Sequence, residues 1–260
     1  MGSIFAGKRV IVTGASQGIG ASVAKSFVNK GASVVLVART KSNLEGVKAE
    51  LKDYHQSKSY IFVADVSKAE EVRGLEQFVL KELAGVDIIV NCAGITIKKS
   101  VVDLDIEEWN KVLDINLKSV FLMAKTFGRH LFRDDDSDYS KFIAIGSVGS
   151  SLSIPTSGAY CASKGGLVQL MKVLANEWAK QKVNVNSIIP GYIATPLSKG
   201  VLENEEVKKG VVTRIPLGEI GEVEDVASAI SFLASQESNY ITGICMNVDG
   251  GYLSAAYTQN

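Results

Sequence analysis

The stretch TGASQGIG, residues 13–20, is the most informative segment of this 260-residue chain. It joins a run rich in β-branched residues, KRVIVTG (8–14), to a segment with helical spacing, GASVAKSFVNKG (20–31). Glycine lets the backbone turn sharply and approach a ligand without a collision at Cβ. The helix that follows offers free N–H groups to a pyrophosphate. A merely tight turn is the other interpretation, but this position between a first strand and a first helix favours a dinucleotide site.

Further short apolar runs follow the first one, separated by segments with helical spacing. They are nearly continuous in apolar residues, which is typical of strands covered on both faces. Strands that alternate with helices imply right-handed crossovers, so the sequence predicts an α/β fold with a doubly wound, parallel, seven-stranded sheet of the Rossmann type. The further strands are expected at 33–39, 59–65, 86–94, 141–147, 183–191 and 243–251, and the clearest helices at 20–31, 107–132, 159–180 and 222–235.

The chain has no internal repeat and no linker, so residues 1–260 are expected to form a single domain. Residues 133–140, RDDDSDYS, are predicted to form a solvated loop rather than a cation site. Residues 191–216 are long for a connection in an α/β domain, although ENEEVKKGVV within them suits a short helix. Because long insertions often cover binding sites, a substrate-binding loop is predicted at about 191–216.

Composition excludes several other classes of protein. Lysine plus arginine and aspartate plus glutamate both number 28, so no strongly basic surface for nucleic acid or membrane is expected. Cys92, Cys161 and Cys245 are far apart and form no C-x-x-C pattern, which argues against a disulfide framework or a metal site. No apolar run approaches the ~18 residues of a membrane span, and no signal peptide is evident. A cytoplasmic protein is predicted.

The spacing G-x-x-x-G-x-G differs from the more common G-x-G-x-x-G and resembles the T-G-x-x-x-G-x-G signature of the short-chain dehydrogenase/reductase family. Other segments resemble the family's motifs in the same order along nearly the whole chain. These are NCAG (91–94), where Cys92 replaces the usual second asparagine, the serine of IGS (145–147), YCASK (160–164), IIPGYIAT (188–195) and VDGG (248–251). The resemblance implies an oxidoreductase that binds a nicotinamide dinucleotide in a Rossmann-type domain.

The family's cofactor contacts carry over to matching positions of this sequence. The resemblance implies that Ile193 contacts the nicotinamide carboxamide through its backbone and Thr195 through its hydroxyl, while Asp65 contacts the adenine. The full expected set is Gly14, Ser16, Gln17, Gly18, Ile19, Gly20, Arg39, Asp65, Val66, Asn91, Ala93, Gly94, Tyr160, Lys164, Pro190, Gly191, Ile193 and Thr195.

The end of the second strand indicates which dinucleotide is preferred. Many dinucleotide folds carry an acid here that holds the ribose hydroxyls of NAD. This strand instead ends VLVART, with Ala38 and Arg39. A planar, always charged guanidinium is suited to a 2′-phosphate, which predicts NADP(H); an arginine capping the strand at the surface is the other interpretation. Lys41 is a possible second contact, whereas Gln17 stands where many NADP-preferring relatives place a basic residue.

The stretch AYCASKGG (159–166) points to chemistry. On a helix Tyr160 and Lys164 share one face, and a surface pair is the simpler interpretation of this spacing alone. Reduction of a ketone requires a proton for the developing alkoxide. A phenol has an ordinary pKa near ~10, and a lysine ammonium nearby lowers it by up to about three units. A tyrosine in this arrangement is therefore a candidate acid and base.

The resemblance assigns roles to four residues. Tyr160 is implied as the general acid/base, and Lys164 lowers its pKa and binds the nicotinamide ribose. Ser147 hydrogen-bonds the substrate carbonyl, and Asn116 helps to hold a water that links Lys164 to solvent. In the wider family the helix that carries the tyrosine packs against its copy in a partner subunit, which implies a homotetramer.

The substrate is less sharply indicated than the reaction. Segments 174–197 and 214–235 resemble members that interconvert sugar acids or polyols with keto forms, such as gluconate 5-dehydrogenase and 2-deoxygluconate dehydrogenase. A keto-sugar, sugar acid or polyol is the first expectation. A 3-oxoacyl thioester reductase is the alternative; an acyl-carrier protein as partner would need a basic patch, for which Lys98, Lys99 and Arg129 are candidates. A non-catalytic NADP-binding regulator is a further alternative.

Overall fold

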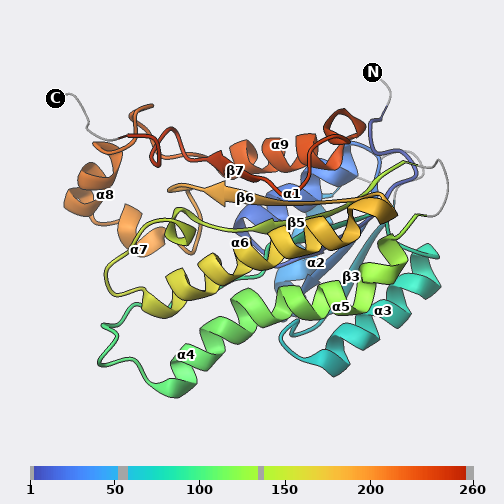
Figure 1. The fold of residues 1–260 in the computed structure, drawn as a ribbon, viewed down its shortest axis with the longest axis horizontal. Helices are drawn as coiled ribbons and strands as arrows, with labels where there is room; N and C mark the ends of the chain where they lie inside the picture. Colours follow the sequence, from blue (N-terminus) through green and yellow to red (C-terminus); the bar gives the residue numbers. More distant parts are fainter. Residues whose placement is uncertain (1–2, 52–57, 134–137, 256–260) are drawn as a thin grey trace.

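A parallel sheet of seven strands forms the centre of the molecule (Figure 1). The structure is a computed structural model that describes residues 3–51, 58–133 and 138–255. Along the sheet the strands follow the order β3-β2-β1-β4-β5-β6-β7, which confirms the predicted doubly wound architecture. Their bounds are β1 Arg9–Thr13, β2 Ser33–Ala38, β3 Ser59–Val63, β4 Ile88–Asn91, β5 Ser140–Ile145, β6 Val183–Pro190 and β7 Cys245–Val248.

Helices cover both faces of the sheet. Consecutive residues of one strand point to opposite faces, so Val10 and Val12 pack with helices α1 and α9 while Ile11, between them, packs with α3, α5 and α6. This double burial explains why the strands read as continuous apolar runs. The helices are α1 Gly18–Asn29, α2 Lys41–Glu50, α3 Ala69–Leu83, α4 Ile106–Leu113, α5 Ser119–Leu131, α6 Gly158–Trp178, α7 Lys199–Leu202, α8 Glu205–Val212 and α9 Val223–Ala234.

Strand order reverses at β1, which pairs with β2 on one side and with β4 on the other. The chain therefore leaves the carboxyl ends of β1 and β4 in opposite directions, which opens a crevice between the two connections. Every loop that carries a predicted site motif leaves the sheet at this same edge, because all seven strands are parallel.

Two predicted segments differ from expectation. The helix expected over 107–132 is divided into α4 and α5 by a π-helical turn, η1 (Asp114–Lys118). The segment 191–216 contains two short helices, α7 and α8, of which α8 corresponds to the helix suspected in ENEEVKKGVV. Of the loop expected at 133–140, residues 134–137 lie outside the described part. No helix in the described ranges has the length and apolar character needed to cross a bilayer.

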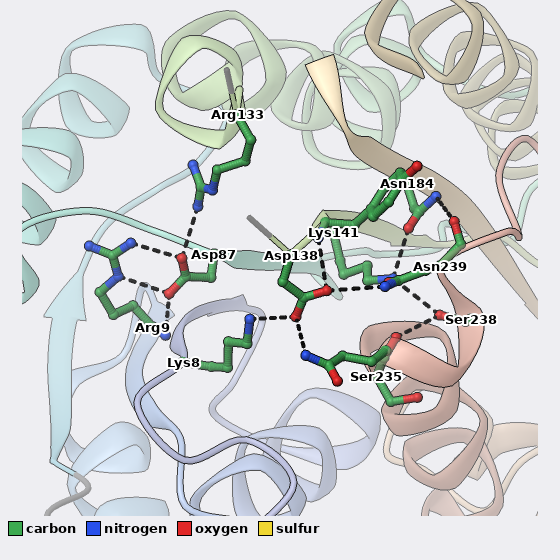
Figure 2. Close-up of polar contacts among 12 residues, drawn as sticks. Lys8, Arg9, Asp87, Arg133, Asp138, Lys141, Asn184, Ser235, Ser238 and Asn239 are labelled. Atoms are coloured by element: carbon green, nitrogen blue, oxygen red, sulfur yellow. Dashed lines mark hydrogen bonds and ion pairs between the residues drawn. The ribbon is translucent and has the colours of Figure 1, made fainter. Parts of the chain in front are cut away.

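Two carboxylates, Asp87 before β4 and Asp138 before β5, connect loops at the amino-terminal edge of the sheet. Figure 2 shows their polar contacts. Asp87, just before β4, accepts hydrogen bonds from Nη2 of Arg9 and from Nη2 of Arg133, each at 2.8 Å. Burial raises the pKa of the Asp87 carboxyl, but the hydrogen bonds and charge of Arg9 outweigh burial and hold that pKa below its usual range. Asp138 accepts from Nζ of Lys8 at 2.7 Å.

Beside Asp138 lies a buried lysine, Lys141 of β5, which is only 2% exposed. Its Nζ donates to Oδ1 of Asn184 and Oδ1 of Asn239, both at 2.7 Å, and to Oγ of Ser238 at 3.3 Å. All three oxygens are neutral. Burial therefore lowers the pKa of Lys141 to about 8, although the charge of Asp138 opposes the shift.

This lysine makes stability dependent on pH in the alkaline range. Between the folded pKa of about 8 and the ordinary 10.5, the unfolded chain holds more protons on Lys141 than the folded chain does. The free energy of unfolding therefore gains a contribution as pH rises through this window, at most about 3 kcal/mol. In Lys141→Met this contribution is absent, so urea denaturation between pH 7.5 and ~10 will show a smaller alkaline gain. Equal pH slopes in the variant and the wild type would contradict the assignment.

Candidate functional site

The crevice at the carboxyl edge of the sheet is a pocket of about 460 Å³. It runs from the ends of β2 and β3, past the glycine-rich turn, to the beginning of α6 and the segment after β6. The structure brings almost all of the predicted site residues into its lining. These are Gly14, Ser16, Gln17, Gly18, Ile19, Gly20, Arg39, Asp65, Val66, Ala93, Gly94, Ser147, Tyr160, Lys164, Pro190, Gly191, Ile193 and Thr195.

The glycine-rich turn packs directly against the loop after β4. Gly14 has φ +65°, and a Cβ atom there would lie 2.7 Å from the backbone nitrogen of Ala93. A Cβ atom on Gly20 would lie 2.2 Å from the carbonyl oxygen of Gly14, so neither position has space for a side chain. Thr13 fixes the same contact, since its Oγ1 accepts hydrogen bonds from the backbone nitrogens of Cys92 (3.2 Å) and Ala93 (3.3 Å).

Helix α1 points its amino terminus into the pocket. No side chain in the described part of the chain caps this end, and the first turn carries no acidic residue. The N–H groups of the turn and the positive end of the helix dipole are therefore available to an anion. Together with the close glycine turn, which admits a ligand to the backbone, this arrangement fits the pyrophosphate of a dinucleotide.

Arg39 and Asp65 lie at the β2 and β3 end of the pocket. Arg39 is exposed. Oδ1 of Asp65 accepts hydrogen bonds from Ser67, at 3.0 Å from the backbone nitrogen and 2.6 Å from Oγ. Burial raises the pKa of Asp65, but these bonds and the charge of Arg39 hold it below its usual range. Lys41, the possible second contact, pairs instead with Glu45 at 3.6 Å.

At the opposite end, Ser147 follows β5 and Tyr160 lies in the first turn of α6. Oγ of Ser147 accepts a hydrogen bond from the backbone nitrogen of Gly149 at 3.0 Å, which fixes the hydroxyl and leaves its own proton available. Burial raises the pKa of Tyr160 above its ordinary value, and a hydrogen bond with the Ser147 side chain only partly opposes this. The phenol is thus protonated at neutral pH in the polypeptide.

Lys164 lies one turn beyond Tyr160 and is 4% exposed. Its Nζ donates to the carbonyl oxygen of Ile145 at 2.7 Å and lies 5.9 Å from the centre of the Tyr160 ring. Burial lowers the pKa of Lys164 to about 8, with a small opposing effect of Cys92. The sequence led us to expect a lysine that lowers the pKa of the phenol. In the polypeptide, burial is the largest cause of the pKa shift of both Tyr160 and Lys164.

Asn116 sits in the π-helical turn η1 and is completely buried. Its Oδ1 accepts from the nitrogen of Ile95 at 2.8 Å, and its Nδ2 donates to the oxygen of Ile95 at 2.9 Å and to Oγ of Ser163 at 3.0 Å. Ser163 in turn donates to the carbonyl oxygen of Tyr160 at 2.7 Å. Asn116 therefore joins the loop after β4 to the first turns of α6 without lining the pocket itself. π-Turns of this kind are frequent at functional sites.

Sequence reasoning missed Ser163, and it did not indicate where the side chain of Asn91 lies. Ser163 directly precedes the lysine of YCASK, and a small polar residue inside that turn was the available signal. Asn91 was expected among the cofactor contacts. Its side chain is buried in the sheet and donates to the carbonyl oxygen of Ile143 at 3.2 Å, so it joins β4 to β5 and does not line the pocket.

Known proteins resemble this chain over almost its whole length. A family model described as enoyl-(acyl carrier protein) reductase matches residues 14–253. A 3-oxoacyl-(acyl-carrier-protein) reductase from Haemophilus influenzae is 36% identical over 249 residues, which cover 95% of this chain and 99% of the relative. A glucose 1-dehydrogenase from Gluconobacter oxydans is 35% identical over 247 residues, 95% of this chain and 92% of the relative.

A crystal structure shows the same fold with a ligand. It is that of a proposed 2-deoxy-D-gluconate 3-dehydrogenase from Agrobacterium tumefaciens with bound NADP. The two chains are 31% identical and align with a TM-score of 0.84, covering 98% of this chain and 100% of the relative.

The link through Ser163 is measurable as stability. Ser163→Ala removes the donor to the Tyr160 carbonyl and one partner of Asn116, so we expect the free energy of unfolding to fall by about 1 kcal/mol. Ser187→Ala is the matched control, because the Ser187 hydroxyl is buried with no hydrogen-bond partner within the described residues. That control should be neutral or slightly stabilising. Equal losses in the two variants, measured by urea denaturation, would argue against the link.

Proposed function

Because the chain belongs to the short-chain dehydrogenase/reductase family, whose oxidoreductases use a nicotinamide cofactor, we propose that it transfers hydride between NADP(H) and a ketone or secondary alcohol. The observation that carries this proposal is the pocket itself. At one end it holds a glycine turn and an uncapped helix terminus that suit a pyrophosphate, and at the other it holds Ser147, Tyr160 and Lys164. One elongated pocket thus suits a dinucleotide and a carbonyl compound together.

Tyr160 is proposed as the proton donor and acceptor. Bound NADPH supplies the hydride in the direction of reduction. The raised pKa keeps the phenol protonated at neutral pH, which suits proton delivery to the oxygen of a ketone. Ser147 receives the Gly149 N–H and is therefore free to donate its own proton to the same oxygen. One of the three N–H donors of the Lys164 ammonium bonds to the Ile145 carbonyl, which leaves two that can bind a ribose.

Asn116 is proposed to hold other groups of the site in place rather than to contact the substrate. Its three side-chain hydrogen bonds hold the loop after β4 and, through Ser163, the carbonyl of Tyr160. Oδ1 of Asn116 accepts the bond from Ile95 and, with a second lone pair, can also accept from a water that links Lys164 to solvent.

The choice of NADP(H) rests on Arg39. The end of β2 carries no carboxylate that would repel a 2′-phosphate, and Arg39 lines the pocket there beside Asp65. The relative from Agrobacterium tumefaciens, which has NADP bound, supports the same choice.

Arg39 should therefore set the preference between the two dinucleotides. In Arg39→Asp, the new carboxylate repels the 2′-phosphate and accepts hydrogen bonds from ribose hydroxyls. We expect the KM for NADPH to rise at least ~10-fold and the KM for NADH to fall, measured by steady-state kinetics. A wild-type enzyme that prefers NADH, or a variant with an unchanged ratio, would overturn this assignment.

The substrate is proposed to be a keto-sugar, sugar acid or polyol. Two relatives named for a sugar or a sugar acid support this class: the glucose 1-dehydrogenase from Gluconobacter oxydans and the proposed 2-deoxy-D-gluconate 3-dehydrogenase from Agrobacterium tumefaciens. Several residues that line the reactive end of the pocket carry hydroxyl groups, a composition that suits a polyhydroxylated ligand; they are Thr96, Ser147, Ser157, Tyr160 and Tyr192. A 3-oxoacyl thioester is the second candidate, which the Haemophilus influenzae relative favours.

We further propose that the chain is one domain and works as a cytoplasmic homotetramer. Two apolar surfaces support association. One lies on α5 and α6, where Phe121 and Val173 are 47% and 45% exposed, and the other lies near β7, where Phe232, Tyr240 and Ile244 are exposed. Large exposed apolar side chains on packed helices are typical of subunit interfaces.

Tyr160→Phe tests the proposed chemistry. The change removes one oxygen at the reactive end and leaves the cofactor end untouched. We expect kcat/KM for ketone reduction to fall by roughly 10²–10⁴, with NADPH still bound as judged by its fluorescence. In the wild type, ionisation of the phenol should not reduce the rate around neutral pH, because the pKa of Tyr160 lies above its ordinary value. A variant that retains wild-type turnover would remove Tyr160 from the mechanism.

A further inference from the structure

The loop after β4 carries two adjacent lysines that face different surroundings. Nζ of Lys99 pairs with Glu108 at 2.7 Å and with Asp105 at 3.2 Å, at the amino terminus of α4. Lys98 lines the pocket and, within residues 3–51, 58–133 and 138–255, has no hydrogen-bond or ion-pair partner. One lysine is thus neutralised by the protein, while the other, an exposed residue of the pocket lining, carries an unpaired ammonium.

The backbone conformation explains why the two lysine side chains point in different directions. Lys99 forms an isolated parallel bridge with Ser157, and its nitrogen donates to the oxygen of Thr156 at 2.8 Å. In such an extended segment, consecutive side chains point to opposite sides. Because Lys99 is turned toward α4, Lys98 is turned the other way. The bridge belongs to the fold and does not depend on either lysine side chain.

The same bridge locates Lys98 at the reactive end of the pocket. Ser157 immediately precedes α6 (Gly158–Trp178), whose first turn carries Tyr160. Figure 1 shows the green loop before α4 close to the beginning of α6. The glycine turn and Arg39, which suit the phosphates, line the other part of the pocket. A charge on Lys98 is therefore available to the substrate rather than to the pyrophosphate.

Lys98 differs from the other charged residues of the pocket lining in its position and in its lack of a partner. The charged lining residues are Arg39, Asp65, Lys98 and Lys164. Asp65 lies beside Arg39 at the far end, and Lys164 is buried against the Ile145 carbonyl. No carboxylate among the described lining residues faces the reactive end. A negatively charged substrate would meet one accessible cation there and no repulsion.

We propose that Lys98 binds the carboxylate of the substrate and so selects a keto acid of the sugar-acid class over neutral ketones. The inference rests on the proposed function and narrows it. Lys98 is a specificity-determining residue: its charge acts on substrate affinity, while the reacting carbonyl lies with Ser147 and Tyr160. The interaction is between full charges at a solvent-accessible site, so it weakens as ionic strength increases.

The test compares 5-keto-D-gluconate with its methyl ester, which differs by the missing charge, in NADPH-dependent reduction. In the wild type the acid should have the lower KM. In Lys98→Met the KM for the acid should rise about 10-fold, while the kcat, the KM for the ester and the KM for NADPH stay within twofold. Lys98→Arg should restore the low KM. Lys99→Met is the matched control, because it removes an adjacent positive charge that the pocket does not use.

Three results would overturn the inference. One is an unchanged KM for the acid in Lys98→Met, and another is a wild type that reduces ester and acid equally well. Either would leave the proposed reduction intact while removing the role of Lys98. The third is reduction of an acetoacetyl thioester without any reduction of 5-keto-D-gluconate, which would also overturn the proposed sugar-acid class. Absence of turnover with every ketone would instead reject the proposed function itself.

Discussion

The contact between the glycine turn and the loop after β4 is the constraint on which the rest of the structure depends. Side chains at Gly14 or Gly20 would overlap backbone atoms, so the turn and the loop approach each other only because these positions lack Cβ. Thr13 secures the approach with its hydroxyl. Backbone atoms of the turn and the loop therefore form the base of the crevice where the strand order reverses. The amino terminus of α1 points into this crevice.

The reactive end is fixed by a second set of contacts that begins at the same loop. Ile95 is held on both its N–H and its C=O by Asn116, and Asn116 is joined through Ser163 to the carbonyl of Tyr160. The position of the tyrosine relative to the glycine turn therefore depends on hydrogen bonds between buried groups, where unpaired donors and acceptors are costly. From the π-turn, the Asn116 side chain makes three hydrogen bonds, two to the Ile95 backbone and one to Ser163.

The sequence was sufficient for the sheet, its two helical layers and most of the pocket lining, because those depend on local patterns. Continuous apolar runs indicated strands buried on both faces, and the glycine spacing placed the turn. The interruption of the helix at Asn116 could not be predicted, because residues 107–132 keep helical spacing throughout. The partners of Asn116 at this break lie on another loop. For Asn91, which the sequence predicts to contact the cofactor, motif position does not reveal that the side chain donates across the sheet to the Ile143 carbonyl.

The opposed directions of Lys98 and Lys99 also depend on tertiary contacts, namely the bridge to Ser157 and the carboxylates of α4. From the sequence, both lysines were equal members of a possible basic patch. The pKa of Tyr160 differs from expectation for a related reason. Proximity of Tyr160 and Lys164 along the helix predicted a lowered phenol pKa, whereas burial, which a spacing argument does not measure, raises it.

Reduction of ketones with NADPH is the activity that this pocket is proposed to support. Its most direct test is the absorbance of the reduced cofactor during incubation of the purified wild-type protein with a panel of keto-sugars, keto sugar acids, diketones and an acetoacetyl thioester. We expect oxidation of NADPH with stoichiometric formation of the alcohol from a keto-sugar or keto sugar acid. Tight binding of NADPH without turnover of any member of the panel would contradict it and would favour a non-catalytic, cofactor-binding regulator.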